Sequence, residues 1–136
     1  SQLHNPGSPF ASILEASELG MAYMENPDFD KQSIKVTTLD DFLGKRRESV
    51  ELKRTFLKID VQGFEMKVLL GGNNSLLDIP MVMVECVLNS LYRESSDLSK
   101  IIEFMKEKGF MVAAIHSDNW FNGFAPDCDV IFSKSR

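Results

Sequence analysis

The chain has 136 residues, which is long enough for one domain with a hydrophobic core and short for two. Its composition, 43% hydrophobic and 26% charged, is that of an ordinary globular protein and excludes a disordered or fibrous chain. The formal net charge of -5 disfavours a nucleic-acid partner, because phosphate binding requires clustered Lys and Arg.

The sequence also disfavours a membrane protein and a metal-binding protein. The longest apolar run, "IPMVMVECVL", is about half of the roughly 20 residues that cross a bilayer, and no basic-then-apolar signal pattern opens the chain. Cys86 and Cys128 lie in apolar surroundings, which is typical of buried reduced thiols in an intracellular protein. They match no metal or redox spacing, and His4 and His116 are the only histidines, so no metal site is expected. We therefore expect a cytoplasmic protein without a membrane span.

The first part of the chain, residues 1–33, predicts irregular structure. Pro and Gly residues interrupt it, with Ser and Asn between them, and only a short helical turn is expected over residues 12–19. The segment "SIKVTTL", residues 33–39, alternates β-branched and polar side chains and predicts a strand. A short helix, "LDDFL" at residues 39–43, is expected next, with Thr38 as its N-cap.

Strands and helices then alternate as far as residue 109. The apolar segment at 80–87 is typical of a central parallel strand that is covered on both faces. Apolar residues on one helical face and a glycine stop make the last helix the clearest element. The predicted elements are the strand "TFLKIDV" (55–61), the helix "FEMKVLLGG" (64–72), the strand "PMVMVECV" (80–87) and the helix "DLSKIIEFMKEKG" (97–109).

Two further strands close the chain. "FMVAAIH" (110–116) and "CDVIFSK" (128–134) are joined by a loop without a helix, which predicts an antiparallel hairpin. Strands that alternate with helices are the signature of a parallel sheet with crossover connections. The expected fold class is α/β, with a mostly parallel sheet that ends in an antiparallel hairpin.

Acidic residues stand at two of the predicted strand ends. Asp60 ends the strand at 55–61, and Glu85 lies toward the end of the strand at 80–87. Ligands of open α/β sheets bind beyond the carboxyl ends of the strands, and neighbouring strands lie about 5 Å apart. The two carboxylates therefore share one crevice if their strands are adjacent.

Glu65 is a third acidic candidate. It lies in the first turn of the following helix, where its charge meets the positive end of the helix dipole. Gly63 allows a sharp turn between Asp60 and that helix.

Each acidic candidate also has a purely structural interpretation. Asp60 can cap the helix that follows it or bond loop amides. Glu85 can pair with Lys58 or Arg93, and Glu65 can serve only as a partner of the helix dipole.

Other residues leave similar alternatives open. His116 at a strand end is either an ordinary surface or core histidine or a proton shuttle. Trp120 and Phe121 either close over a ligand or plug the end of the sheet. No G-x-G-x-x-G follows a strand, and neither a Walker loop nor a nucleophile elbow is present, so these residues alone offer no nucleotide cradle.

Five segments, in their order and spacing, resemble the FkbM-type family of S-adenosylmethionine-dependent methyltransferases. The most specific is "KIDVQGFE" with the "VLLGG" that follows it, and "SPFASIL" near the start resembles a serine-rich segment of the family. The resemblance covers nearly the whole chain. The five segments are "VTTLDDFL", "FLKIDVQGFEMKVLLGG", "MVMVECVLNSLYRES", "IIEFMKEKGF" and "DCDVIF".

The resemblance implies the C-terminal half of a Rossmann-like class I methyltransferase fold. Residues 55–61 would be its fourth strand, 80–87 its fifth and the closing hairpin its last two. The first strands of that fold, which carry the glycine-rich loop and the ribose-binding acid for the cofactor, have no counterpart here. The chain would then divide into an irregular N-terminal segment, 1–33, and the C-terminal part of a methyltransferase domain, 34–136.

The resemblance also implies roles for individual residues. Asp60 would stand where cofactor and acceptor meet, with Gln62 and Gly63 beside it as cofactor-binding residues. Asp60, Glu85 and Glu65 are the catalytic candidates, and Gln62 stands where many members carry glutamate.

The expected reaction is methyl transfer from S-adenosylmethionine to a hydroxyl of a sugar, a lipid-linked glycan or a polyketide. This chain alone would be inactive, because the main cofactor-binding half is missing. The free apolar edge of the strand at 55–61 would be covered by upstream residues or by another chain, such as a second copy in a homo-oligomer.

Two other functions remain as alternatives. A truncated or degenerate domain could serve as a non-catalytic interaction module, which the missing glycine-rich half favours. A phospho-receiver domain also has a strand-end aspartate, but the order of elements lacks the acidic pair and the lysine that it needs.

Overall fold

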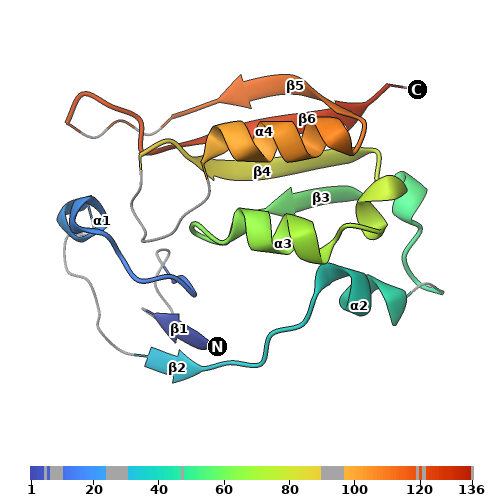
Figure 1. Cartoon of the computed structure of the whole chain (residues 1–136), viewed down its shortest axis with the longest axis horizontal. Helices are drawn as coiled ribbons and strands as arrows, with labels where there is room; N and C mark the ends of the chain where they lie inside the picture. Colours follow the sequence, from blue (N-terminus) through green and yellow to red (C-terminus); the bar gives the residue numbers. More distant parts are fainter. Residues whose placement is uncertain are drawn as a thin grey trace.

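The computed structural model describes residues 1–4, 6, 11–23, 31–46, 48–89, 97–118, 120 and 122–135. Figure 1 shows a small sheet with helices packed in front of it and a separate two-stranded ribbon near the N-terminus. The elements in chain order are β1 (Gln2–His4), α1 (Glu18–Tyr23), β2 (Lys31–Ser33), α2 (Leu39–Gly44), the 3₁₀ helix η1 (Leu52–Arg54), β3 (Phe56–Ile59), α3 (Glu65–Gly71), the 3₁₀ helix η2 (Ser75–Leu77), β4 (Met81–Val87), α4 (Leu98–Glu107), β5 (Phe110–His116) and β6 (Asp127–Lys134).

The main sheet has four strands in the order β3-β4-β6-β5. β3 and β4 are parallel, with Leu57 opposite Val82. β6 runs antiparallel to both β4 and β5, so the predicted antiparallel hairpin is confirmed. β3, β4 and β5 share one direction, as expected for a mostly parallel sheet. Because β6 lies between β4 and β5, however, the contacts of β6 are antiparallel and only the β3–β4 contact is parallel.

One face of this sheet forms the core. Val82, Val84 and Cys86 of β4 alternate with more exposed neighbours and are buried on the side that α3 and α4 cover (Figure 1). Ile101 and Met105 of α4 join the same hydrophobic cluster. The opposite face carries the other half of each strand, including Met81 and Glu85, and is less well covered.

The helices predicted at 39–43, 64–72 and 97–109 are confirmed as α2, α3 and α4, and side chains cap the first and the last of them. Thr38 precedes α2, and its hydroxyl accepts a hydrogen bond of 3.1 Å from the Asp41 amide. Asp97 precedes α4, and its carboxylate accepts a bond of 2.8 Å from the Ser99 amide. Such caps satisfy amides that have no partner within the helix. No helix in the described ranges has the length and apolar character needed to cross a membrane.

The strand predicted at residues 33–39 is wrong. The strand β2 ends at Ser33 and pairs with β1, whereas residues 34–38 run to α2 outside any strand. An alternating pattern is not sufficient, because an extended segment becomes a strand only where a partner strand supplies its hydrogen bonds. The helical turn expected at 12–19 also lies later in the chain, in α1, where Ser17 accepts a bond of 3.1 Å from the Gly20 amide.

Candidate active site

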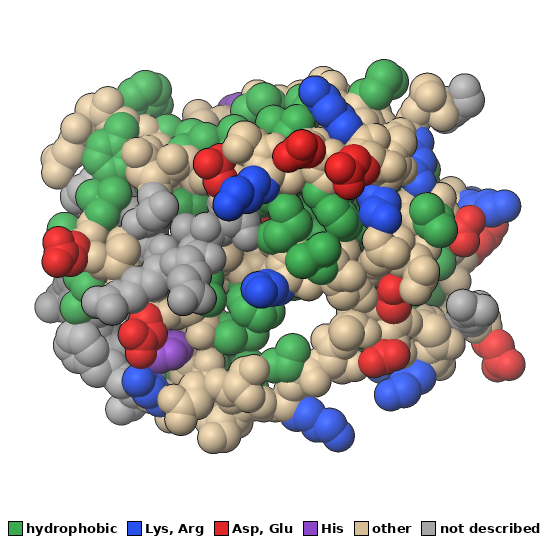
Figure 2. Space-filling view, in the orientation of Figure 1, with side chains coloured by type: hydrophobic (Ala, Val, Ile, Leu, Met, Phe, Trp, Pro, Cys, Tyr) green, Lys and Arg blue, Asp and Glu red, His purple; other side chains and the backbone are tan. Residues whose placement is uncertain are grey.

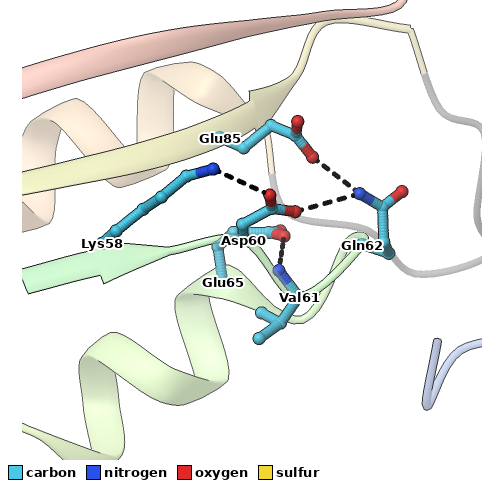
Figure 3. Close-up of polar contacts among 6 residues, drawn as sticks. All are labelled: Lys58, Asp60, Val61, Gln62, Glu65 and Glu85. Atoms are coloured by element: carbon cyan, nitrogen blue, oxygen red, sulfur yellow. Dashed lines mark hydrogen bonds and ion pairs between the residues drawn. The ribbon is translucent and has the colours of Figure 1, made fainter. Parts of the chain in front are cut away.

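A tight turn follows β3, and two of its residues have a left-handed backbone conformation. Gln62 has φ 50° and Gly63 has φ 96°, a region that non-glycine residues rarely occupy. The turn sends the chain back into α3 immediately beyond the carboxyl end of β3 (Figure 3).

Glu65 holds this turn from the inside. Its Oε1 accepts bonds from the Val61 amide at 3.2 Å and from the Gly63 amide at 2.9 Å. The side chain is 1% exposed, and its Oε2 is buried without a hydrogen-bond partner among the described residues. Burial raises the pKa of Glu65 despite these backbone bonds. Glu65 therefore lies beneath the turn and does not face the rim of the sheet with the other two predicted carboxylates.

Asp60 and Glu85 meet at the carboxyl ends of adjacent strands, as expected if those strands were neighbours. The Gln62 side-chain amide lies between them (Figure 3). Its Nε2 donates to Asp60 Oδ1 at 3.1 Å and to Glu85 Oε2 at 2.8 Å. An amide NH₂ has two donors, so a single Gln62 side chain serves both acids.

Asp60 faces outward at the rim. Its side chain is 35% exposed, and its Oδ2 is 3.1 Å from Lys58 Nζ. The alternative in which Asp60 caps α3 is wrong, because the N-cap residue is Phe64 and makes no side-chain capping bond. Of the partners considered for Glu85, Lys58 is paired with Asp60 instead, and Arg93 lies outside the described residues.

The surroundings drive the pKa values of the two acids apart. Partial burial would raise the pKa of Asp60, but hydrogen bonds from Lys58 and Gln62 outweigh it and hold that pKa below the ordinary value. Burial and the nearby charge of Asp60 raise the pKa of Glu85 to about 8. The two groups titrate as a coupled pair, so near neutral pH the pair retains one proton and one negative charge.

Two acids of β6 also belong to this face and were missed by the sequence prediction. Asp129 lies directly opposite Glu85 in the antiparallel register, and Asp127 is two residues away on the same face. Both add negative charge that contributes to the raised pKa of Glu85. The pattern Asp-Cys-Asp around buried Cys128 indicates that the acids share a face, but the sequence does not reveal the pairing of β6 with β4.

The remaining candidates lie on the surface. His116 Nε2 is 2.7 Å from Asp118 Oδ1, and both side chains are exposed, in keeping with an ordinary surface histidine. Trp120 is 74% exposed and therefore does not plug the sheet. Phe121 lies outside the described residues. Within the described ranges, no group of three or more His, Cys, Asp or Glu side chains is placed to hold a metal ion.

Two hollows lie away from the acid pair. One, of about 440 Å³, lies among α2, η1 and η2 at the amino ends of the strands and includes Asp40 and Asp78. The other, of about 470 Å³, lies between α3 and the segment leading into α2. Neither is lined by Asp60 or Glu85.

Comparison with known proteins identifies the family. The family model of the methyltransferase FkbM domain matches residues 3–112, which is most of the chain. No curated protein and no solved structure gives a match. The chain that places Asp60, Gln62 and Glu85 together at the ends of two parallel strands is thus a member of the methyltransferase FkbM domain family.

Proposed function

We propose that this protein is an S-adenosylmethionine-dependent O-methyltransferase and that Asp60 and Glu85 are the catalytic residues at the rim of its sheet. The observation that carries the proposal is the bridged pair at the carboxyl ends of β3 and β4, with Asp60 ionised and Glu85 protonated. Ligands of open α/β sheets bind at this edge.

S-adenosylmethionine, when bound, supplies a methyl group on a positively charged sulfur. Asp60 would accept a hydrogen bond from the acceptor hydroxyl and so orient it for methylation, a reaction that depends mainly on alignment. The Asp60–Glu85 pair, which holds one proton near neutral pH, would take up the proton that the acceptor hydroxyl releases on methylation. Glu65 shapes the turn and does not touch the reactants.

The residues present suit one end of the cofactor. Asp60 is an exposed, ionised carboxylate, which favours a nearby ammonium or sulfonium group. The turn formed by Gln62 and Gly63 brings the backbone to the same rim. Within the described ranges, no strand leads into a glycine-rich turn that would hold the nucleoside end, so these three residues would hold only the methionine end.

Three observations support a larger fold that residues outside this chain complete. The order β3-β4-β6-β5, with β6 reversed, agrees with the C-terminal half of a class I methyltransferase sheet. Phe56 on the edge strand β3 is 52% exposed. The hollow beside α3 is lined by Val36, Val61 and Phe64, and Figure 2 shows it as an opening bordered by hydrophobic side chains. Upstream residues or another chain would cover these surfaces.

The acceptor is a hydroxyl on a sugar, a lipid-linked glycan or a polyketide, as the family resemblance suggests. We propose a cytoplasmic location for this reaction.

Thermal unfolding with S-adenosylhomocysteine tests the proposal. We compare this chain with a longer protein that includes the residues encoded upstream of Ser1. Ligand that binds only the folded state at about 100 times its Kd stabilises by about 2.7 kcal/mol, a shift of several degrees in Tm. The longer protein is expected to show this shift and the present chain to show none.

A non-catalytic interaction module is the second candidate. It is favoured by the lack of a nucleoside-binding turn among the described residues. No shift in either protein with S-adenosylhomocysteine would contradict the methyltransferase proposal and favour the module.

A further inference from the structure

Ser12 connects the N-terminal segment to the turn after β3. Its hydroxyl donates a hydrogen bond of 2.7 Å to the Gln62 carbonyl, although the two residues are 50 positions apart. Ser12 is 2% exposed. It is itself fixed, because its backbone pairs with His4 at 2.7 and 3.1 Å and its hydroxyl oxygen accepts the Leu14 amide at 3.0 Å.

The turn needs such contacts because of its backbone conformation. A left-handed Gln62 persists only where its surroundings hold it. Glu65 binds the amides of Val61 and Gly63 from the inside. Ser12 donates to the carbonyl of Gln62. The peptide group between Gln62 and Gly63 is therefore held on both sides, its carbonyl by Ser12 and its N–H by Glu65.

The backbone conformation of Gln62 in turn sets the direction of its side chain. We propose that Ser12 is a positioning residue of the acid pair: by holding the Gln62 carbonyl, it keeps the Gln62 amide between Asp60 and Glu85. Without the Ser12 bond, the turn relaxes and the amide leaves the two carboxylates. The functional meaning of this role rests on the proposed methyltransferase function, but its test does not involve methyl transfer.

The charges around Glu85 make the loss of this amide measurable. Asp60 of β3 and Asp127 and Asp129 of β6 place negative charge near Glu85, and Lys58 of β3 is held by Asp60. Gln62 supplies a donor to the Glu85 carboxylate within this group. A donor stabilises the ionised form, so its removal favours the protonated form and raises the pH at which Glu85 titrates.

The experiment is a pH titration of the Glu85 side-chain carboxyl by NMR in the intact protein. Ser12→Val and Ser12→Thr are a matched pair, because Val and Thr have similar shapes and only Thr keeps the hydroxyl. Ser12→Val and Gln62→Ala are both expected to move the midpoint of the Glu85 titration upward from about 8. Ser12→Thr is expected to leave that midpoint unchanged. The double variant Ser12→Val, Gln62→Ala is expected to have the same Glu85 midpoint as Gln62→Ala alone, because both changes remove the same hydrogen bond from Gln62 to Glu85.

Ser17→Ala provides the control for a general effect of the N-terminal segment, since the Ser17 hydroxyl accepts the Gly20 amide at the start of α1. It is expected to leave the Glu85 midpoint unchanged. If Ser12→Val does not fold, Ser12→Ala replaces it in the same comparison. The proposal is overturned if removing the Ser12 hydroxyl lowers Tm but leaves the Glu85 titration at its wild-type position, or if its effect adds to that of Gln62→Ala.

Discussion

Asp60 and Glu85 are similar side chains in contact with the same amide, yet they carry different charges near neutral pH. Asp60 has Lys58 as a second partner, which favours its ionised form. Glu85 is more deeply buried and faces the charge of Asp60, which favours its protonated form. Pairs of titratable groups with pKa values driven apart are typical of sites that move protons.

The raised pKa of Glu85 predicts how stability depends on pH. Its pKa is about 8 in the folded protein against 4.5 for the free group, so between these values the folded state keeps a proton that the unfolded chain loses. The free energy of unfolding therefore falls as pH rises through this window and levels off above it. Asp60 has the opposite effect on the free energy of unfolding. Its pKa is lowered from 3.8, so the stability that it contributes is lost as pH falls and Asp60 becomes protonated.

Glu85→Gln is expected to remove this pH-dependent loss. After allowance for solvent screening and for the shared proton, the loss in the wild type is roughly 1 kcal/mol over the window. Urea unfolding at intervals from acidic to alkaline pH measures it, and Glu103→Gln on the exposed face of α4 is the control. Equal slopes in the wild type and in Glu85→Gln would show that Glu85 is not the group with the raised pKa.

At the scale of the elements, one carboxylate joins α2 to η2. Asp40 Oδ2 accepts the Asn74 amide and its side-chain nitrogen, each at 3.0 Å. Asp40 Oδ1 accepts the Ser75 amide at 2.8 Å and the Ser75 hydroxyl at 2.6 Å. Burial alone would raise the pKa of Asp40, but these bonds outweigh it and lower that pKa. These bonds hold α2 beside the end of α3, the helix that follows the turn at Gln62 and Gly63.

Asp40→Ala is expected to lower the free energy of unfolding by about 2 kcal/mol at neutral pH, because it leaves the Asn74 and Ser75 donors without their acceptor. Asp41→Ala is the matched control. Both acids lie in the first turn of α2, so both variants lose the same dipole interaction of about 0.5 kcal/mol. Urea unfolding of the two variants at pH 7 measures the difference. Similar losses would show that the bonds to η2 do not stabilise the fold.

The elements differ in how far the sequence predicts them. α2 and α4 were predictable, because Thr38 and Asp97 are local caps next to a periodic apolar pattern. The segment at 34–38 was mispredicted, and the insertion of β6 between β4 and β5 was not predicted, because both depend on which distant strands meet. The pattern of one strand does not encode its partner.

In the candidate site, too, features set by the local sequence were predictable and features set by distant contacts were not. Asp60 and Glu85 were predictable from their places at strand ends. The inward direction of Glu65 was not, because it follows from the left-handed turn. The contact of Ser12 with Gln62 depends on the packing of a segment 50 residues away.

At the scale of the whole molecule, the sheet is covered unevenly. α3 and α4 bury one face, whereas exposed apolar residues remain at both edge strands, Phe56 in β3 and Met111 in β5. The parallel pair β3–β4 lies at one of these edges. An exposed apolar edge is a site for pairing with a further strand, so the proposed fold predicts that the edge of β3 is covered.

Amide hydrogen exchange in the intact protein tests whether β3 is covered. If upstream residues or another chain pair with β3, the amides of Phe56–Ile59 are expected to exchange as slowly as those of the inner strand β4. Fast exchange along β3 in a monomeric, soluble sample would show that the edge is free.

The central claim is that the acid pair faces the positively charged methyl donor, and ligand binding by the intact protein tests it most directly. We compare S-adenosylhomocysteine, which is neutral at sulfur, with an analogue that carries a protonated amine in place of the methyl-bearing sulfur. Asp60→Asn is expected to weaken binding of the cationic analogue by about tenfold or more, which is about 1.4 kcal/mol. Its effect on the affinity for S-adenosylhomocysteine is expected to be small. Asp41→Asn, remote from the rim, is expected to change neither. Equal affinities of wild type and Asp60→Asn for the cationic analogue would contradict the claim.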